Sequence, residues 1–147
     1  MFKNILVPTD GSALSRKAIK QAVQLAREQG ARITGLHVVQ PYAPDVREEF
    51  SVRHFVSPQE YARRTATAAR QHLRVIERAA ETAGVPCDTC HAPNNFPHDE
   101  IVRTAQKRKC DLIYMASHGR RGISRLLLGS EASKVLALSK VPVIICR

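Results

Sequence analysis

The sequence predicts an α/β protein built on a doubly wound parallel sheet, and three observations lead to that fold class. Short apolar runs alternate with longer stretches of helical periodicity along all 147 residues. The apolar runs are close to continuous, as expected of strands that helices cover on both faces. Glycines, prolines and helix-capping residues separate the two kinds of segment. We therefore expect one five-stranded, Rossmann-like domain over residues 1–147, with helices on both faces of the sheet.

Local signals define the first strand and the first helix. Ile5 to Val7 is an apolar run that stops at Pro8, because proline cannot continue a buried ladder. Ser12 suits the N-cap of a helix whose alanines recur at helical spacing, and Gly30 suits its C-cap. A second apolar strand is expected at 32–39.

The middle of the chain adds an irregular segment, a long helix and a third strand. Residues 40–57 contain prolines and mixed charge, which favours a loop over the surface. Pro58 suits the first turn of a helix that ends before Gly84, since a first-turn residue needs no partner for its N–H. Residues 85–91 are expected to form the third strand, the most polar of the five.

The last third of the chain supplies the remaining two strands and two helices. A short amphipathic helix is expected at 99–109, followed by an apolar strand at 111–116. After a glycine-containing connection, residues 131–139 have helical character. Val141 to Cys146 then forms an apolar terminal strand.

The four cysteines are expected to be reduced thiols, because no signal-peptide pattern accompanies them. Cys87 and Cys90 resemble a redox or metal-binding pair. They lie on an expected strand at an odd spacing, which directs their side chains to opposite faces of the sheet. We therefore interpret both as ordinary strand residues and expect no metal site there.

The net charge of +10 arises from 23 Lys and Arg against 13 Asp and Glu. The basic residues are spread along the chain, and aromatic residues, which could stack on single-stranded bases, make up only 5%. The charge therefore favours anionic ligands and weak, non-specific polyanion binding, without a specific nucleic-acid partner. No apolar run approaches the roughly 20 residues needed to cross a bilayer, so we expect a cytoplasmic protein without a membrane partner.

The connection between the fourth strand and the last helix carries the most informative motif. Its glycines, Gly119, Gly122 and Gly129, tolerate positive φ and a close approach, so successive backbone N–H groups can face a phosphate. Ser130 would cap the helix that follows, and the positive end of that helix adds to the anion site. This connection is therefore predicted to bind a phosphate group.

The motif resembles the phosphate loop of the universal stress protein family, Gly-x2-Gly-x9-Gly-Ser/Thr, with Ala116 in place of the first glycine. The similarity extends from Lys3–Ser12 through Leu36–Val38 to Lys140–Ile145, almost the whole chain. It implies the strand order 3-2-1-4-5, in which the first and fourth strands are neighbours where the winding reverses. Ligands of open α/β sheets bind beyond the carboxyl ends of strands at such a point.

The resemblance implies that ATP, or ADP or AMP, binds between the loops that follow the first and fourth strands. Pro8-Thr9-Asp10 is similar to the ATP-binding members, in which the aspartate contacts the nucleoside; by position alone, Asp10 would be a turn or capping residue. The implied nucleotide-binding residues are Pro8, Thr9, Asp10, Val38, Met115, Ala116, His118, Gly119, Arg120, Gly129, Ser130 and Glu131. Mg²⁺ or Mn²⁺ could accompany the phosphates.

The family resemblance also implies a homodimer in which the strand Val141–Cys146 pairs with its symmetry mate. The strand is short, apolar and expected at an edge, where unpaired backbone groups need a cover or a partner. Pro142 would remove one donor from such a ladder.

The leading prediction is a nucleotide-binding regulatory protein of the stress response, and two alternatives stay open. His118 could serve as a base in a slow ATPase or phosphotransferase, although the sequence fixes no acid or nucleophile beside it. Ala116 adds a methyl group near the sugar, which favours a dimeric interaction protein of the same fold that binds no nucleotide. Arg120 is open to two interpretations, a clamp on phosphate oxygens or a solvated side chain. The motifs of P-loop enzymes and serine hydrolases do not occur in the sequence.

Overall fold

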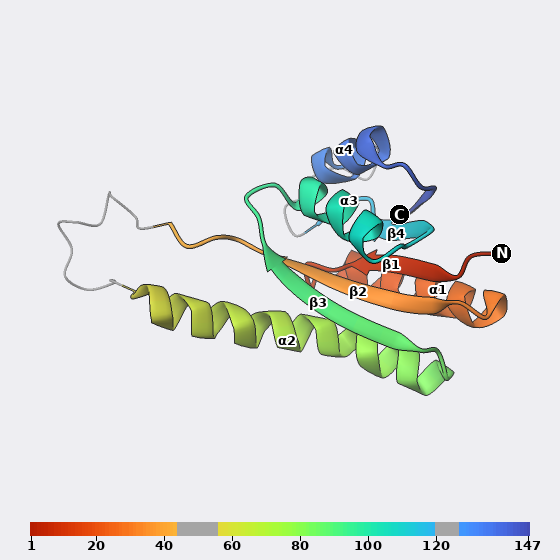
Figure 1. Cartoon of the computed structure of the whole chain (residues 1–147), viewed down its shortest axis with the longest axis horizontal. Helices are drawn as coiled ribbons and strands as arrows, with labels where there is room; N and C mark the ends of the chain where they lie inside the picture. Colours follow the sequence, from red (N-terminus) through yellow and green to blue (C-terminus); the bar gives the residue numbers. More distant parts are fainter. Residues whose placement is uncertain (44–55, 120–126) are drawn as a thin grey trace.

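The computed structural model describes residues 1–43, 56–119 and 127–147 (Figure 1). Within them, five strands form one parallel sheet in the order β3-β2-β1-β4-β5. The strands are β1 (Asn4–Pro8), β2 (Arg32–Val39), β3 (Cys87–Pro93), β4 (Leu112–Ala116) and β5 (Val143–Cys146). The helices are α1 (Ala13–Gln29), α2 (Pro58–Ala83), α3 (Pro97–Lys107) and α4 (Ser130–Leu138). This is the predicted doubly wound fold, with β1 and β4 adjacent where the winding reverses.

The helices form two layers, with α1 and α2 on one face of the sheet and α3 and α4 on the other (Figure 1). Alternate residues of β1 point to opposite faces of the sheet. Ile5 and Val7 pack beneath α1 and α2, whereas Leu6 packs beneath α3 and α4. Because both faces of the central strands are covered, most of the apolar residues of β1, β2 and β4 are buried.

The prediction that the Cys87 and Cys90 side chains lie on opposite faces of the sheet is confirmed. Cys87 packs against the cluster beneath α1 and α2, and Cys90 packs against the cluster on the opposite face. Burial raises the pKa of the Cys87 thiol to about 11 and also raises the pKa of the Cys90 thiol. Both groups are therefore protonated thiols rather than thiolates near neutral pH.

The helix caps expected from the sequence are present in α1 and α2. The Ser12 hydroxyl accepts a hydrogen bond from the Ser15 N–H at 3.1 Å. Gly30 and Gly84 end the two helices in the left-handed conformation, with φ of 65° and 68°. The Val85 N–H then returns to the Ala80 carbonyl at 2.9 Å. That bond is why β3 begins at Cys87 and not at Val85 as predicted.

Two further boundaries differ from the prediction for local reasons. The helix expected at 99–109 instead spans Pro97–Lys107, because Lys109 takes a left-handed φ of 54° and the Cys110 N–H closes onto the Ala105 carbonyl. The strand expected from Val141 begins at Val143, because the Ser139 hydroxyl accepts the Val141 N–H and closes a turn.

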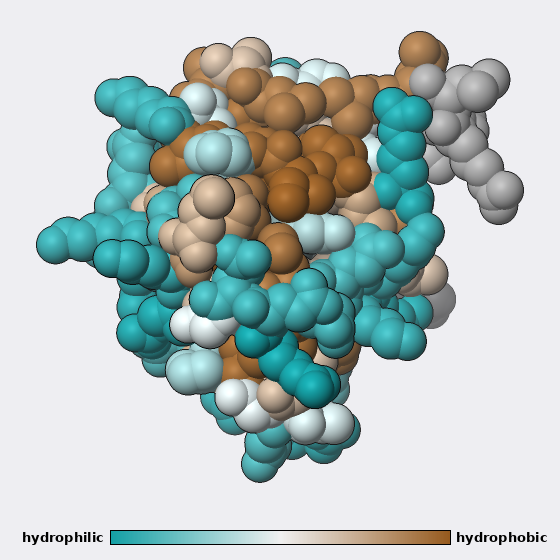
Figure 2. Space-filling view, turned by 90° about the vertical axis from the view of Figure 1, so that its right-hand side faces the viewer, coloured by the Kyte–Doolittle hydropathy of each residue, from teal (hydrophilic) through white to brown (hydrophobic). Residues whose placement is uncertain are grey.

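The strand β5 lies at one edge of the sheet, beside α4. Figure 2 shows apolar surface gathered over the upper part of the molecule, where Figure 1 places α4. Leu136 and Leu138 of α4 are exposed, and Val143 and Ile145 of β5 are only partly buried. In the part of the chain that the structure describes, no helix combines the length and apolar character required to cross a membrane.

Candidate functional site

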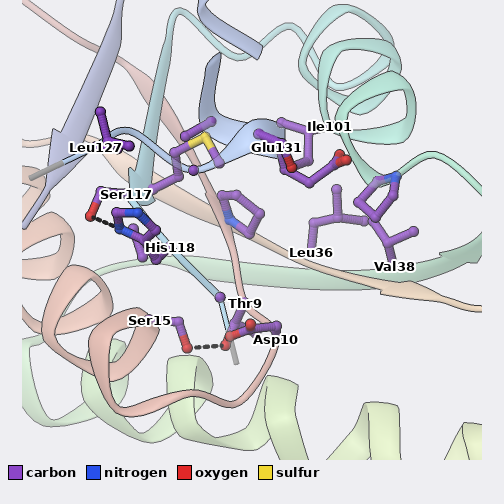
Figure 3. A pocket seen from close by; sticks show the side chains of 18 residues that line it. Thr9, Asp10, Ser15, Leu36, Val38, Ile101, Ser117, His118, Leu127 and Glu131 are labelled. Carbon is purple, nitrogen blue, oxygen red and sulfur yellow. Dashed lines mark hydrogen bonds between the residues drawn. The ribbon is translucent and has the colours of Figure 1, made fainter. Parts of the chain in front are cut away.

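A cavity of about 720 Å³ opens beyond the carboxyl ends of β1 and β4 (Figure 3). Its volume lies within the roughly 300–1,000 Å³ that is typical of small-molecule sites. Of the residues predicted to bind nucleotide, those that line this cavity are Pro8, Thr9, Asp10, Val38, Met115, Ala116, His118, Gly119, Gly129, Ser130 and Glu131. The remaining one, Arg120, lies outside the described residues, as does Gly122. The structure therefore brings all the described candidates to one place.

The loop between β1 and α1 is held by its own hydrogen bonds. The Thr9 hydroxyl accepts the Gly11 N–H and also contacts the Ser15 hydroxyl, both at 3.1 Å. Asp10 Oδ1 accepts the Ser12 N–H at 2.9 Å, an Asx turn that precedes the helix. Gly11 takes a φ of 79°, which favours glycine. This loop therefore forms a fixed wall of the cavity with the Asp10 carboxylate at its rim.

The base of the loop between β4 and α4 is closed by backbone hydrogen bonds. The Gly129 N–H donates to the Ser117 carbonyl at 2.9 Å, and the Ser117 N–H donates to the Cys146 carbonyl at 2.8 Å. A Cβ at Gly129 would collide with that same Ser117 carbonyl oxygen, and a Cβ at Gly119 would collide with the Asp10 carboxylate. Neither glycine has a positive φ. Close approach, and not a left-handed conformation as the sequence also suggested, is what requires glycine at both positions.

The N-terminus of α4 lacks the predicted serine cap. Ser130 is the first residue of the helix, and Gly129 occupies the N-cap position, so no side chain of the described residues caps α4. The first helical bond runs from the Ser133 N–H to the Gly129 carbonyl at 2.9 Å. Within the described residues the N–H groups of Ser130 and Glu131 have no hydrogen-bond acceptor. The positive end of α4 therefore opens onto the cavity, as in helix termini that bind anions.

The Glu131 side chain of α4 forms hydrogen bonds with the neighbouring helix α3. Its Oε2 accepts the backbone N–H of His98 at 2.7 Å and lies 2.9 Å from the His98 ring Nδ1. Phe96, the N-cap residue of α3, provides no side-chain cap, so the Glu131 carboxylate takes that place at the positive end of α3. Glu131 thus ties together α3 and α4, the two helices that close one side of the cavity. Sequence reasoning missed His98, because its partner lies 33 residues away and no local pattern links them.

The His118 ring has a single hydrogen-bond partner within the described residues. Its Nδ1 lies 3.0 Å from the Ser117 hydroxyl, and Figure 3 shows both side chains near Leu127, away from the labelled Asp10. No carboxylate orients the ring in the described part of the chain. This environment suits a hydrogen-bonding role better than that of a general base, which would need an orienting partner.

The rest of the cavity wall is largely apolar. Leu36 and Val38 of β2, Ile101 of α3 and Met115 of β4 face it. Additional lining residues that the sequence analysis did not name as candidates are Ser15, Leu36, Pro97, Ser117, Ile101, Leu127 and Ala132. Leu36 could have been found from strand pairing, since it lies in register with Pro8. The cavity thus combines an apolar wall with a cluster of open N–H groups, which suits a ligand with a flat apolar part and an anionic part.

No group of three or more His, Cys, Asp or Glu side chains is arranged to hold a metal ion in residues 1–43, 56–119 and 127–147. The carboxylates that line the cavity are Asp10 and Glu131. Asp10 Oδ1 accepts a hydrogen bond from the Ser12 N–H, and Glu131 Oε2 accepts one from the His98 N–H.

The whole chain, residues 1–147, matches the model of the Universal stress protein family. Universal stress protein YxiE of Bacillus subtilis is 34% identical over 151 residues, and the match covers 100% of both chains. Among solved structures, protein MJ0577 of Methanocaldococcus jannaschii gives a TM-score of 0.80 at 29% identity. That match covers 99% of this chain and 96% of the other.

Two other solved structures with this fold contain an adenine nucleotide. A universal stress protein in complex with cAMP has a TM-score of 0.71 at 24% identity, covering 99% of this chain and 97% of the other. The universal stress protein of Archaeoglobus fulgidus in complex with dAMP has a TM-score of 0.64 at 20% identity, with coverage of 99% and 98%.

Proposed function

Because this chain belongs to the universal stress protein family, we propose that it is a stress-response regulatory protein that binds ATP, or ADP or AMP, in the cavity between β1 and β4. The observation that carries the proposal is the uncapped N-terminus of α4, whose open N–H groups face a cavity of nucleotide size. Two proteins of the same fold hold cAMP and dAMP, which supports an adenine ligand. Binding, and not turnover, is the proposed activity.

We propose that different parts of the nucleotide contact different parts of the cavity. Val38 and Met115 offer apolar surface for the base, and the Asp10 carboxylate can accept a hydrogen bond from a ribose hydroxyl. The N–H groups of Ser130 and Glu131 can donate to phosphate oxygens, aided by the dipole of α4. Because both lining carboxylates already accept hydrogen bonds, Mg²⁺ or Mn²⁺ would be held chiefly by the phosphates themselves.

Calorimetric titration with ATP, AMP, adenosine and GTP tests the proposal. We expect ATP to bind more tightly than adenosine, because only ATP reaches the end of α4, and more tightly than GTP. Asp10→Ala should weaken ATP and adenosine equally, since its proposed contact is to the ribose. The absence of heat and of any thermal shift at millimolar ATP would rule the proposal out, and would favour the interaction protein without nucleotide that Ala116 suggests.

We further propose that the protein forms a homodimer through β5. The strand is an edge of the sheet, and apolar side chains gather beside it on the surface seen in Figure 2. The carbonyls of Pro142 and Cys146 accept N–H groups from the β4 side, so the alternating N–H groups of Val143 and Ile145 face the open edge and can donate to a partner ladder. Sedimentation should give a dimer at tens of micromolar, and Ile144→Lys should shift it to a monomer. A wild-type monomer would contradict the proposal.

The cytoplasmic location stays a prediction.

A further inference from the structure

The two helix layers carry very different charge. Helices α1 and α2 together hold nine Arg and Lys against four Glu, whereas α3 and α4 hold three basic residues against three acidic ones. The layers lie on opposite faces of the sheet, so the excess positive charge is gathered on one side of the molecule (Figure 1). This side is remote from the cavity mouth residues contributed by α3 and α4.

Three arginines of α2 form a ladder that has no partner in the described residues. Arg70, Arg74 and Arg78 are exposed and follow one another at intervals of four residues, so together they span about 12 Å of helix. None of their side chains forms an ion pair or hydrogen bond with the described part of the chain. Like charges at this spacing repel, so the ladder itself lowers helix stability.

The surroundings of the ladder show that the missing partners are not a general feature of α2. Arg63 and Arg64 both bind Glu60, at 2.9 and 2.8 Å. Glu77, which could have neutralised the ladder, instead accepts the Thr89 hydroxyl of β3 at 2.6 Å. The arginines at the start of the helix are therefore held in ion pairs, whereas those of its second half extend into solvent, in a segment that also carries Glu77 and Glu81.

We infer that the outer face of α2 binds the phosphate backbone of duplex nucleic acid without reading its sequence. All basic residues of α2 are arginine, whose planar guanidinium donates bidentately to phosphate. A duplex strand carries one phosphate about every 3.4 Å of axis, so a 12 Å ladder can follow about three or four of them. The exposed large apolar side chains of α2 include no aromatic ring on which unpaired bases could stack. A duplex, and not a single strand, is the polyanion that fits.

Fluorescence anisotropy of a labelled 20-base-pair DNA duplex, measured over a range of salt concentrations, tests the inference with the full chain. Wild-type protein should bind at low salt, with log K falling linearly against log salt. Arg70→Gln/Arg74→Gln/Arg78→Gln should reduce the steepness of that fall by about 2.7, since each lost phosphate contact removes about 0.9 from the slope. Glutamine keeps helix propensity, and unchanged circular dichroism would confirm that the variant is folded.

A control variant removes the same amount of charge from residues outside α2, two in α3 and one between α4 and β5. Arg103→Gln/Lys107→Gln/Lys140→Gln should leave the slope unchanged, and both triple variants should keep the wild-type response to ATP. Equal losses in the two variants would overturn the inference, because net charge alone would then explain binding. It would also be overturned by absence of duplex binding at low salt, by tighter binding of single strands, or by equal binding of polyglutamate, which would indicate an acidic protein partner.

Discussion

The two loops that meet at the cavity differ in where their hydrogen bonds go. The loop from β1 to α1 forms hydrogen bonds within itself: Thr9 and Asp10 accept nearby N–H groups, and Ser12 caps the helix. The loop from β4 to α4 is closed at its base by Gly129, but the first N–H groups of α4 have no acceptor among residues 1–43, 56–119 and 127–147. The first loop is therefore built for rigidity, and the second is built to receive an anion. Apart from Asp10, whose carboxylate we propose to contact the ribose, changes in the first loop should act mainly on stability, and changes in the second mainly on phosphate binding.

The largest effect is expected from Gly129→Ala, which places a Cβ against the backbone oxygen of Ser117. That oxygen also accepts the Gly129 N–H, so the start of α4 must move. The N–H groups at the start of α4 then no longer point into the cavity toward the phosphates. ATP affinity should fall about hundredfold, or ~2.7 kcal/mol, comparable to one or two hydrogen bonds to a charged group. Calorimetry with ATP measures the loss.

Gly119→Ala is the matched control for that prediction. Its Cβ would meet Oδ2 of the Asp10 carboxylate, a side-chain atom that can shift without moving the start of α4, and not a backbone atom. Its effect on ATP affinity should therefore be clearly smaller. If the two alanine variants lost equal affinity, the backbone closure at Gly129 would not be the feature that positions α4.

The next largest effect is expected from breaking the link between Glu131 and His98. The expected change in ATP affinity is opposite to the change that charge repulsion alone would give. Removing a carboxylate from the cavity should strengthen phosphate binding if Glu131 only repels phosphate. If Glu131 holds α3 and α4 together, Glu131→Ala should weaken ATP binding about fivefold to tenfold, whereas Glu131→Gln should retain most of it by still accepting the His98 N–H. Tighter ATP binding by Glu131→Ala would refute the linking role.

A smaller effect, on stability, is expected from the caps. Ser12→Ala removes a hydrogen bond to the Ser15 N–H and should lower the free energy of unfolding by about 1 kcal/mol. Ser130→Ala removes no capping bond and should change that free energy by less than about 0.5 kcal/mol. Urea denaturation of both variants makes the comparison. Equal losses would contradict the contrast between a capped α1 and an uncapped α4.

The same contrast explains what the sequence could predict. Strand and helix order, the Ser12 cap and the C-caps at Gly30 and Gly84 depend on neighbouring residues, and they were predicted correctly. The strand order came from the family resemblance and was also correct. The gathering of the two loops around one cavity follows from that order.

Features that depend on distant contacts were not predicted. The role of Glu131 requires His98 of another helix, and the need for glycine at 129 arises from Ser117, twelve residues earlier in the chain. The expectation that Ser130 caps α4 was wrong because the helix begins one residue earlier than its sequence pattern indicated. Spacing alone does not show which N–H groups a fold leaves open.

The smallest effect is expected from His118→Ala, and it separates a binding protein from an enzyme. The His118 ring contacts only the Ser117 hydroxyl in the described part of the chain, so it can offer a phosphate one hydrogen bond, worth about 0.5–1 kcal/mol. ATP affinity should therefore fall about twofold to fivefold, less than for any change at Gly129. ADP release, followed in parallel by a coupled assay, should be slow in the wild type and unchanged in the variant, because no carboxylate orients the ring as a base. A collapse of turnover in His118→Ala at unchanged ATP affinity would show that the β4–α4 loop performs chemistry, and the ATPase alternative would then replace the binding role.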